Sequence, residues 1–284
     1  MVTFDGYRLQ NELLDDVIAE AERALRVTVE PNRRTYGTQG ATVGYPTTCG
    51  TWLRLAWRAP HEVHADSWTG VELASTIIGV AKPALFRSYR WIDETRNVVW
   101  RADEAELVTA LAIHPSGVLD VDPELTETWW DGLASSLASL AAVDTIRITM
   151  GQAHLTRRID QVFGDRRIDT TITEWATAHG DLHFGNLTAP DCILLDWQDW
   201  GRGPRGLDVA TLWGHSLLVP VVAERIQTRF STDLRSRTGR LAQLLFCANV
   251  IRLNTNKPSA SPLLRPAIQA SERLLEQLST DPDN

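Results

Sequence analysis

Hydrophobic and polar residues in the first hundred positions follow mostly strand-like patterns. Residues 51–58 alternate between two faces, are rich in Trp, and are bounded by Gly50 and Pro60, which predicts a β-strand. The period of two places Arg54 and Arg58 on the same face of this strand. Further strands are expected at these ranges: 26–29, 41–45, 85–92 and 97–100.

Two segments of this first part have a helical period instead. Apolar residues recur at helical spacing in residues 12–25, with acidic residues between them, which predicts an amphipathic helix. Residues 67–79 predict a second helix that ends at Gly79. Two interpretations of Glu72, in the first turn of that helix, are open: compensation of the helix dipole and an ion pair with Arg54.

Strand patterns stop near residue 103, and helical patterns follow. A small hairpin is expected where residues 182–187 closely precede the continuous apolar run 192–195. The sequence therefore predicts an α+β protein with a small β-rich N-terminal lobe at 1–103 and a larger, mainly helical C-terminal lobe at 104–284. The expected helices of the second lobe are 104–113, 125–143, 151–163, 207–219, 221–230, 234–251 and 263–278.

The composition is that of a globular protein. Of the 284 residues, 43% are hydrophobic and 23% are charged, which is enough apolar material for a core. No apolar run approaches the ~18 residues that would span a bilayer, so no membrane partner is expected. The N-terminus has no basic and then apolar signal pattern, so we expect a cytoplasmic protein. The three cysteines are too far apart for a disulfide framework or a zinc motif.

The charge of the chain argues against a nucleic-acid partner. Its net charge is −8, and no basic stripe is available to neutralise phosphates. The acidity is concentrated in the middle, because residues 1–117, 118–186 and 187–284 carry −3, −6 and +1. Two interpretations are open: an acidic surface that attracts a cationic substrate, and a solvated acidic helix face.

The stretch from His179 to Asn186, followed by Asp196, has chemistry that a fold alone does not need. Asp181, Asn186 and Asp196 lie at the expected hairpin, where their oxygen-bearing side chains can converge on one small volume. Oxygen ligands suit Mg²⁺ better than zinc. The set predicts phosphoryl transfer, in which one carboxylate takes a proton from an attacking hydroxyl while the other two residues hold metal on a polyphosphate.

A zinc site is the weaker interpretation of the same stretch. His179 and His183 are four residues apart, as zinc ligands on one helix face are. However, Gly180 and Asp181 between them are poor residues for a helix interior, and no third ligand at a metal spacing follows.

Three motifs resemble the aminoglycoside phosphotransferase and choline kinase superfamily: HGDLHFGN at 179–186, LDWQD at 195–199, and Gly203-Pro204 with DVA at 208–210. The resemblance covers residues 177–212, and the order of elements before them agrees with it. It implies a bilobal protein-kinase-like fold. It also implies a magnesium-dependent small-molecule kinase that moves the γ-phosphoryl of ATP or GTP to a hydroxyl of an antibiotic or related natural product, and so confers resistance.

The resemblance implies roles for individual residues. Asp181 is expected to be the catalytic aspartate that orients and deprotonates the acceptor hydroxyl. His179 is expected to brace the catalytic loop. Asn186 and Asp196 are expected to hold magnesium.

Three further residues are expected to support this site. Asp208 is interpreted as a structural cap and loop anchor. Asp199 is expected either behind the metal ligands or close to the acceptor. His183 is typical of the antibiotic kinases, but the resemblance implies no chemical step for it.

One position departs from the superfamily, whose N-terminal lobe carries a lysine that holds the α- and β-phosphates and pairs with a helix glutamate. Here the matching residues are Arg54 and Glu72, while the only lysines, Lys82 and Lys257, lie elsewhere. Arginine keeps the charge but replaces a compact ammonium with a planar fork. The alternative to an active kinase is therefore a pseudokinase or ligand-binding protein without turnover.

Overall fold

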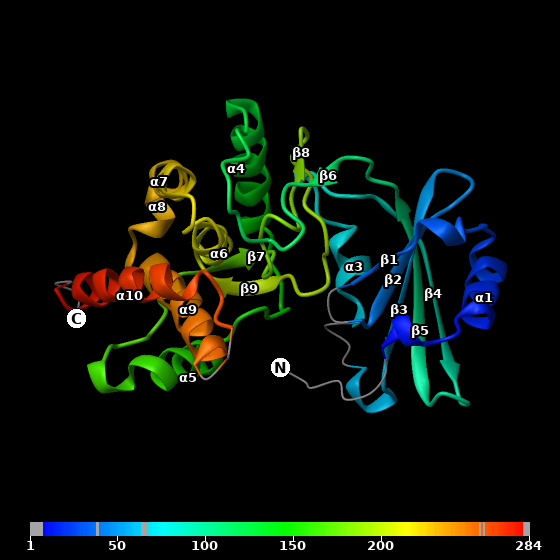
Figure 1. Ribbon diagram of the computed structural model, residues 1–284, viewed down its shortest axis with the longest axis horizontal. Coiled ribbons are helices and arrows are strands. Elements are labelled where there is room, and N and C mark those ends of the chain that lie inside the picture. Colours follow the sequence, from blue (N-terminus) through cyan, green and yellow to red (C-terminus); the bar gives the residue numbers. More distant parts are fainter. Residues whose placement is uncertain (1–7, 38–39, 64–67, 256, 258, 281–284) are drawn as a thin grey trace. The chain divides into compact units, whose positions relative to one another are not determined.

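The computed structural model describes residues 8–37, 40–63, 68–255, 257 and 259–280. The chain divides into two compact units: unit 1 comprises residues 1–76 with 82–109, and unit 2 comprises residues 77–81 with 110–284. Figure 1 shows that unit 1 is built around a sheet and that unit 2 is mostly helical. The predicted α+β class, with a sheet followed by a mainly helical region, is confirmed.

Unit 1 contains a five-stranded antiparallel sheet with the strand order β1-β2-β3-β5-β4. In the long central pair β3 and β5, Arg54 lies directly opposite Asp103. The strands are β1 Thr35–Tyr36, β2 Thr42–Pro46, β3 Thr51–Arg58, β4 Leu85–Asp93 and β5 Val98–Glu106.

The two faces of this sheet differ because side chains alternate along each strand. Leu53 and Leu55 of β3 are fully buried in a hydrophobic core that they share with helix α1 (Asp15–Leu25). Arg54 points to the other face. Figure 1 shows α1 and the short helix α3 (Gly70–Ala74) on opposite sides of the strands, and both contact β4.

Some sequence predictions for unit 1 are wrong. The strand expected at 26–29 is absent, because Arg26 has a left-handed φ of 54° that ends α1. The strand expected at 97–100 continues to Glu106, because charged residues of β5 find partners within the sheet. The helix expected at 104–113 is therefore absent and is replaced by the end of β5 and by β6 (Leu111–Ala112). Helix α3 is shorter than the expected 67–79, and Ser67 lies outside the described residues.

Unit 2 is organised around the long helix α9 (Arg237–Asn254), which packs against α5, α6 and α10. Four of the expected helices, α4, α5, α7 and α10, begin and end within two residues of the predictions. Besides α9, the described α-helices of unit 2 are α4 Glu127–Ala141, α5 Gln152–Phe163, α6 Leu207–His215, α7 Pro220–Arg229, α8 Ser231–Leu234 and α10 Leu264–Ser279. Short 3-10 helices occur in unit 1 at Leu9–Asn11, Pro31–Arg33 and Pro60–Glu62, and in unit 2 at Gly164–Arg166.

Local chemistry explains where several of these helices begin. Thr126 precedes α4, and its hydroxyl accepts a hydrogen bond from the Trp129 amide at 3.2 Å. Ser236 caps α9 in the same way, with the Gly239 amide at 3.0 Å. Helix α7 begins with Pro220, whose fixed φ suits the first helical position.

Two small sheets in unit 2 hold the segments that carry the motifs. β7 (Trp175–Ala178) pairs with β9 (Gly201–Pro204), and β6 pairs with β8 (Thr188–Ala189). The run 192–195 is not a strand, which corrects the prediction. Only Leu194 forms a bridge, with Leu187, so the chain still reverses between them as the expected hairpin does.

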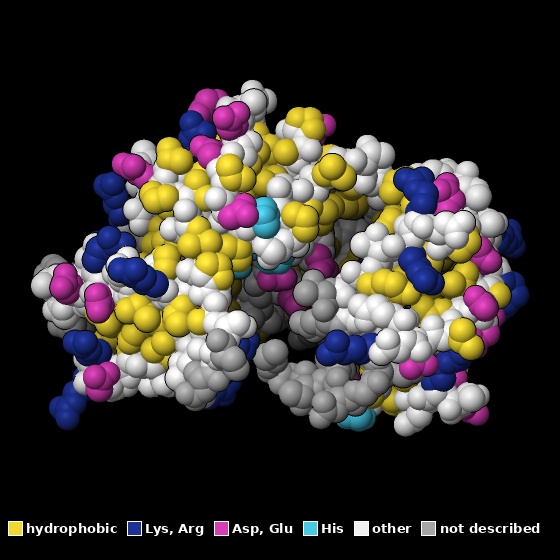
Figure 2. All heavy atoms as spheres, viewed as in Figure 1, with side chains coloured by type: hydrophobic (Ala, Val, Ile, Leu, Met, Phe, Trp, Pro, Cys, Tyr) yellow, Lys and Arg dark blue, Asp and Glu magenta, His cyan; other side chains and the backbone are white. Residues whose placement is uncertain are grey.

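Among the described residues, no helix combines the length and the apolar character needed to cross a membrane. On the face of the molecule in Figure 2, hydrophobic, acidic and basic side chains are interspersed on each unit.

Candidate active site

The segment after β7 forms a loop whose backbone is held by one carboxylate. The His179 amide donates to Oδ2 of Asp208 at 2.7 Å, and the Gly180 amide donates to Oδ1 at 2.9 Å. Burial raises the pKa of Asp208, while His179 and the two amide donors act in the opposite direction. Asp208 thus anchors the loop. It does not cap α6, contrary to the prediction, because the N-cap residue of that helix is Gly206.

Gly180 is the residue at which this loop turns. Its φ is +87°, in the left-handed region that favours glycine. A Cβ at this position would lie 2.1 Å from Oγ1 of Thr149 and 2.9 Å from the carbonyl oxygen of Asp199. Any side chain here would therefore displace the loop.

His179 is entirely buried and links the loop to the segment before Asp196. Its Nε2 donates to the carbonyl of Leu195 at 2.8 Å, and its ring packs edge-on against Trp197. It is therefore placed to brace the loop and cannot form a zinc pair with His183. Among the described residues, no group of three or more His, Cys, Asp or Glu side chains is arranged to hold a metal ion.

Asp181 presents its carboxylate to solvent, since its side chain is 55% exposed. The Asn186 amide group donates to the Asp181 carbonyl at 2.9 Å and lies 3.4 Å from its Oδ2. The Gly185 amide donates to Nδ1 of His183, so the proton of that ring is on Nε2, which faces Oδ2 of Asp181 at 3.6 Å. The structure thus brings these three predicted site residues together.

Asp196 is held next to this group by the backbone on either side of it. The Leu195 amide donates to the Asn186 carbonyl at 2.9 Å, and the Trp197 indole donates to the Leu194 carbonyl at 2.8 Å. Asp196 itself is exposed and has a left-handed φ of 61°, which aspartate tolerates better than most residues. The carboxamide oxygen of Asn186 and the carboxylate of Asp196 are oxygen donors, the ligand type that suits Mg²⁺.

His215, at the end of α6, is a neighbour of this group that the sequence analysis missed. Its Nδ1 donates to the Thr211 carbonyl at 2.9 Å, which leaves the lone pair on Nε2. The ring lies 5.5 Å from the His183 ring and 5.0 Å from that of Phe246. Burial lowers its pKa to about 4, so it is neutral at pH 7. No local sequence pattern marks it, because only the packing of α6 places it there.

Arg147 is a second residue that the sequence analysis missed. It is buried, donates from Nε to the Trp200 carbonyl at 3.0 Å, and donates from Nη2 to the Gln198 carbonyl at 2.9 Å. Its guanidinium also lies over the Trp200 ring. It therefore fixes the short segment that contains the exposed Asp199.

Unit 1 holds the other two predicted site residues. Nη1 of Arg54 lies 3.9 Å from Oδ2 of Asp103, and the Arg54 side chain is 22% exposed. Asp103 also accepts two hydrogen bonds of 2.8 Å from Nε of the buried Arg101. Asp103 thus lies between two arginines and orients both of them.

Of the two open interpretations of Glu72, the structure does not show the ion pair with Arg54 and shows other partners. Glu72 pairs with Arg90 of β4 and lies 3.7 Å from Nη1 of Arg101. The sequence analysis missed Arg101 because it ended the expected strand at residue 100, where charged residues begin. In the folded sheet its charge is compensated by Asp103 and Glu72.

Part of the acidity in the middle of the chain is compensated within unit 2. Glu127 and Asp131 of α4 form ion pairs with Arg229 of α7, and Glu127 also lies 3.5 Å from Arg225. These two carboxylates face partner helices, in contrast to Asp181.

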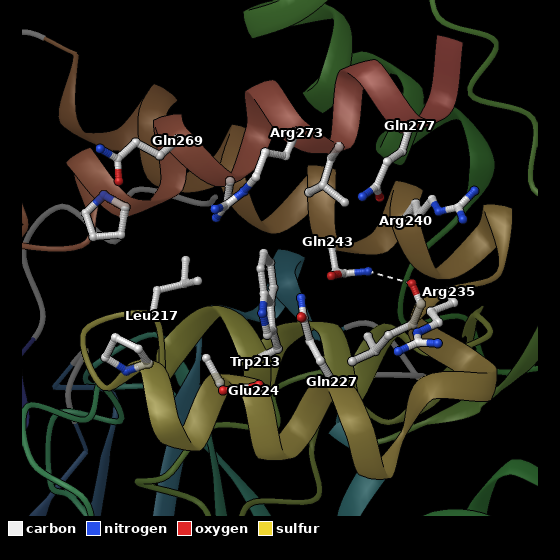
Figure 3. Close-up of a pocket in the computed structure, with 16 residues that line it drawn as sticks. Trp213, Leu217, Glu224, Gln227, Arg235, Arg240, Gln243, Gln269, Arg273 and Gln277 are labelled. Atoms are coloured by element: carbon white, nitrogen blue, oxygen red, sulfur yellow. Dashed lines mark hydrogen bonds between the residues drawn. The ribbon is translucent and has the colours of Figure 1, made fainter. Parts of the chain in front are cut away.

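A groove of about 790 Å³ lies between helices α6, α7, α9 and α10. Figure 3 shows Trp213 of α6 rising into it and Arg273 of α10 pointing towards Trp213. Residues two positions apart in an α-helix are separated by about 200° around its axis, so Trp213 and His215 lie on nearly opposite faces of α6. The groove is therefore separated from the loop of Asp181 by the helix itself.

Residues 173–240, which contain all the motifs of the loop, match the phosphotransferase enzyme family. Solved structures match over nearly the whole chain. The crystal structure of aminoglycoside phosphotransferase APH(4)-Ia has a TM-score of 0.54 at 11% identity, over 94% of this chain and 97% of that one. The chain has the protein-kinase-like fold of the aminoglycoside phosphotransferases.

Two further aminoglycoside phosphotransferase structures were determined with bound molecules. A thermostable APH(4)-Ia mutant was solved with ADP and hygromycin B, and matches with a TM-score of 0.53 at 10% identity over 93% of this chain and 97% of that one. The ternary complex of APH(2″)-IIa with streptomycin and ATP has a TM-score of 0.54 at 11% identity over 93% of this chain and 97% of that one. No curated protein sequence matches this chain.

Proposed function

We propose that this protein is a magnesium-dependent kinase that transfers the γ-phosphoryl group of ATP or GTP to a hydroxyl of an antibiotic or a related natural product. The proposal rests on the exposure and the contacts of the Asp181 carboxylate. This carboxylate is exposed in a loop whose backbone is fixed by Asp208, while Asn186 and His183 contact it. A fixed and accessible carboxylate is what the deprotonation of an acceptor hydroxyl requires.

Asn186 and Asp196 are the residues that would hold magnesium. When bound, the metal neutralises charge on the phosphates and polarises the group being transferred. The chain's own contribution is to keep both oxygen ligands beside Asp181, through the amide of Leu195 and the buried His179. Asp181 then receives the proton of the acceptor hydroxyl.

Arg54 is proposed to contact the nucleotide phosphates, and Asp103 is proposed to orient it. The role of the superfamily's helix glutamate is thus divided in unit 1: Asp103 faces Arg54, while Glu72 serves Arg101 and Arg90. A guanidinium can bind phosphate through two parallel hydrogen bonds.

The proposed biological role is antibiotic resistance. It is supported by the fold, since the similar APH(4)-Ia and APH(2″)-IIa structures contain hygromycin B or streptomycin with a nucleotide. Phosphorylation of a hydroxyl adds negative charge and bulk, which would prevent an antibiotic from fitting its own target.

The test is a screen of hydroxylated antibiotics and metabolites with ATP or GTP and Mg²⁺, read by mass spectrometry as the gain of one phosphate. We expect at least one acceptor to gain phosphate and the gain to disappear when the metal is chelated. Metal-dependent nucleotide binding without phosphate on any acceptor would instead support the non-catalytic alternative, which the Arg54 substitution favours.

A further inference from the structure

The surface of α5 carries a group of basic residues for which the described part of the chain provides no ion-pair partner. His154, Arg157 and Arg158 lie on the first two turns of α5, and Arg252 lies in the last turn of α9, which packs against α5. Figure 1 shows α5 beside α9, within unit 2. These four residues are called the α5–α9 basic cluster below.

Both ring nitrogens of His154 face the side chains of arginines. Nη2 of Arg157 lies 3.1 Å from its Nδ1, and Nε of Arg158 lies 3.2 Å from its Nε2. A neutral imidazole has a single lone pair, so only one of these approaches is a hydrogen bond. Burial lowers the pKa of His154, and the arginines next to it act in the same direction.

The arginines of the cluster lack the ion pairs that arginines elsewhere in unit 2 have. Among the described residues, no carboxylate lies within 4 Å of the guanidinium of Arg157, Arg158 or Arg252, whereas Arg229 has two such partners. Arg158 contacts only an uncharged side chain besides His154, that of Gln161 at 3.3 Å. The pKa of Arg158 is lowered by burial and then by Arg252 and Arg157.

Arg252 provides an independent observation. Its Nε is buried and has no hydrogen-bond partner. A buried charged donor without an acceptor is costly, and the carbonyl end of α9 offers only about half a negative charge. An anion with more than one charge and several acceptor oxygens would offset the repulsion among the arginines of the cluster.

We propose that the α5–α9 basic cluster binds the phosphate group of a phosphorylated small molecule. A phosphate monoester carries close to two negative charges at pH 7 and has three acceptor oxygens, which match several guanidinium donors. A carboxylate brings one charge and leaves more of the repulsion among the arginines uncompensated. The proposal does not rest on the proposed transfer reaction, because it involves neither Asp181 nor Arg54.

The test is a titration of the full chain, with labelled arginine side chains, by inorganic phosphate at low ionic strength. We expect the guanidinium signals of Arg157, Arg158 and Arg252 to shift to saturation. Arg252→Gln should weaken phosphate binding about tenfold or more, as the loss of a charge-assisted hydrogen bond does. Arg265→Gln is the matched control, because Arg265 is an exposed arginine of α10, and its binding should equal that of the wild type.

Three results would overturn the proposal. One is a shift that does not saturate or that acetate reproduces, since this indicates an adventitious ion only. Another is a phosphate affinity that stays unchanged in Arg252→Gln and in Arg158→Gln. If Arg252→Gln does not fold, unchanged affinity in Arg158→Gln alone overturns the proposal. The third is loss of the Arg252 shift in Arg54→Ala, because binding would then belong to the nucleotide site.

Discussion

The two groups of predicted site residues are held in place by different kinds of interaction. In unit 2, the loop of Asp181 is fixed by its backbone, through amides that donate to Asp208 and a buried histidine that donates to a carbonyl. In unit 1, the interactions described for Arg54 involve side chains, because its guanidinium faces Asp103, which also pairs with Arg101. Backbone anchoring leaves little freedom to the loop, whereas an arrangement of side chains can be rebuilt with other residues.

Because of this difference, we expect the loop to tolerate substitution less well than the surroundings of Arg54. A change at Gly180 meets Thr149 and the backbone of Asp199. At position 54, by contrast, the structure shows a side-chain carboxylate, that of Asp103 on the adjacent strand, 3.9 Å from the guanidinium. The predictions below test each side of this comparison.

The largest effect is expected from breaking the side-chain arrangement at its centre. Asp103→Ala leaves Arg101, a 2% exposed residue, without its main partner. Removing one partner of a buried ion pair costs about 3–5 kcal/mol, and we expect that loss in the free energy of unfolding by urea. Glu30→Ala, which removes an exposed ion pair with Arg33, is the control and should change it little. A loss as small as that of the control would show that the buried network does not stabilise unit 1.

The next largest effect is expected in the pH dependence of the free energy of unfolding, through His215, which lies next to His183 of the loop. His215 has a pKa of about 4 in the native protein, against 6.5 for an exposed histidine. The unfolded chain therefore takes up a proton that the native chain does not, so this contribution is present above pH 6.5 and is lost as the pH falls towards 4. We expect it to amount to roughly 3 kcal/mol.

The measurement is the free energy of unfolding between pH 7 and pH 4, for the wild type and for His215→Gln. The variant should lose stability less steeply than the wild type, because glutamine does not titrate. His61→Gln, at an exposed position of unit 1, should retain the wild-type slope. Equal slopes for all three proteins would show that His215 is not buried in neutral form beside His183.

A smaller effect is expected at the cationic position itself. Arg54→Ala should weaken nucleotide affinity about 10- to 100-fold, through the loss of a charge-assisted hydrogen bond, whereas Arg54→Lys should keep most of it. Calorimetric titration with ATP and Mg²⁺ provides the measurement. Unchanged affinity in Arg54→Ala would make Arg58 or Lys82 the candidate phosphate contact.

The sequence predicted those parts of the fold that depend on local pattern. The strand 51–58 and the helices near 125–143 and 151–163 have clear periods and boundaries, and the structure contains all three. The segment 101–106 was misassigned because its charged residues pair with Arg54 and Arg87 of neighbouring strands and with Glu72 of α3, which no local pattern reveals. The strand expected at 192–195 failed for a related reason, since its apolar residues are buried without strand pairing beyond Leu194.

The residues of the candidate site also fall into two groups, those that the sequence predicted and those that only the folded chain reveals. Asp181, Asn186 and Asp196 were predicted because their side chains have chemistry that a fold does not require. The structure places Asp181 beside Asn186 and Asn186 beside Leu195, whereas their roles stay a prediction. Partners that act through tertiary contact were missed. His215 meets His183 only after α6 packs, and Asp103 meets Arg54 only through strand pairing.

The central claim is that Asp181 does chemistry while its surroundings only hold it. The most direct test is the turnover number for phosphoryl transfer at saturating nucleotide, with nucleotide affinity measured in parallel, for the wild type, Asp181→Asn and the exposed control Asp144→Asn. The account predicts a fall of about 10²–10⁴-fold for Asp181→Asn with unchanged nucleotide affinity, and no change for Asp144→Asn. Turnover by Asp181→Asn near the wild-type rate would contradict it.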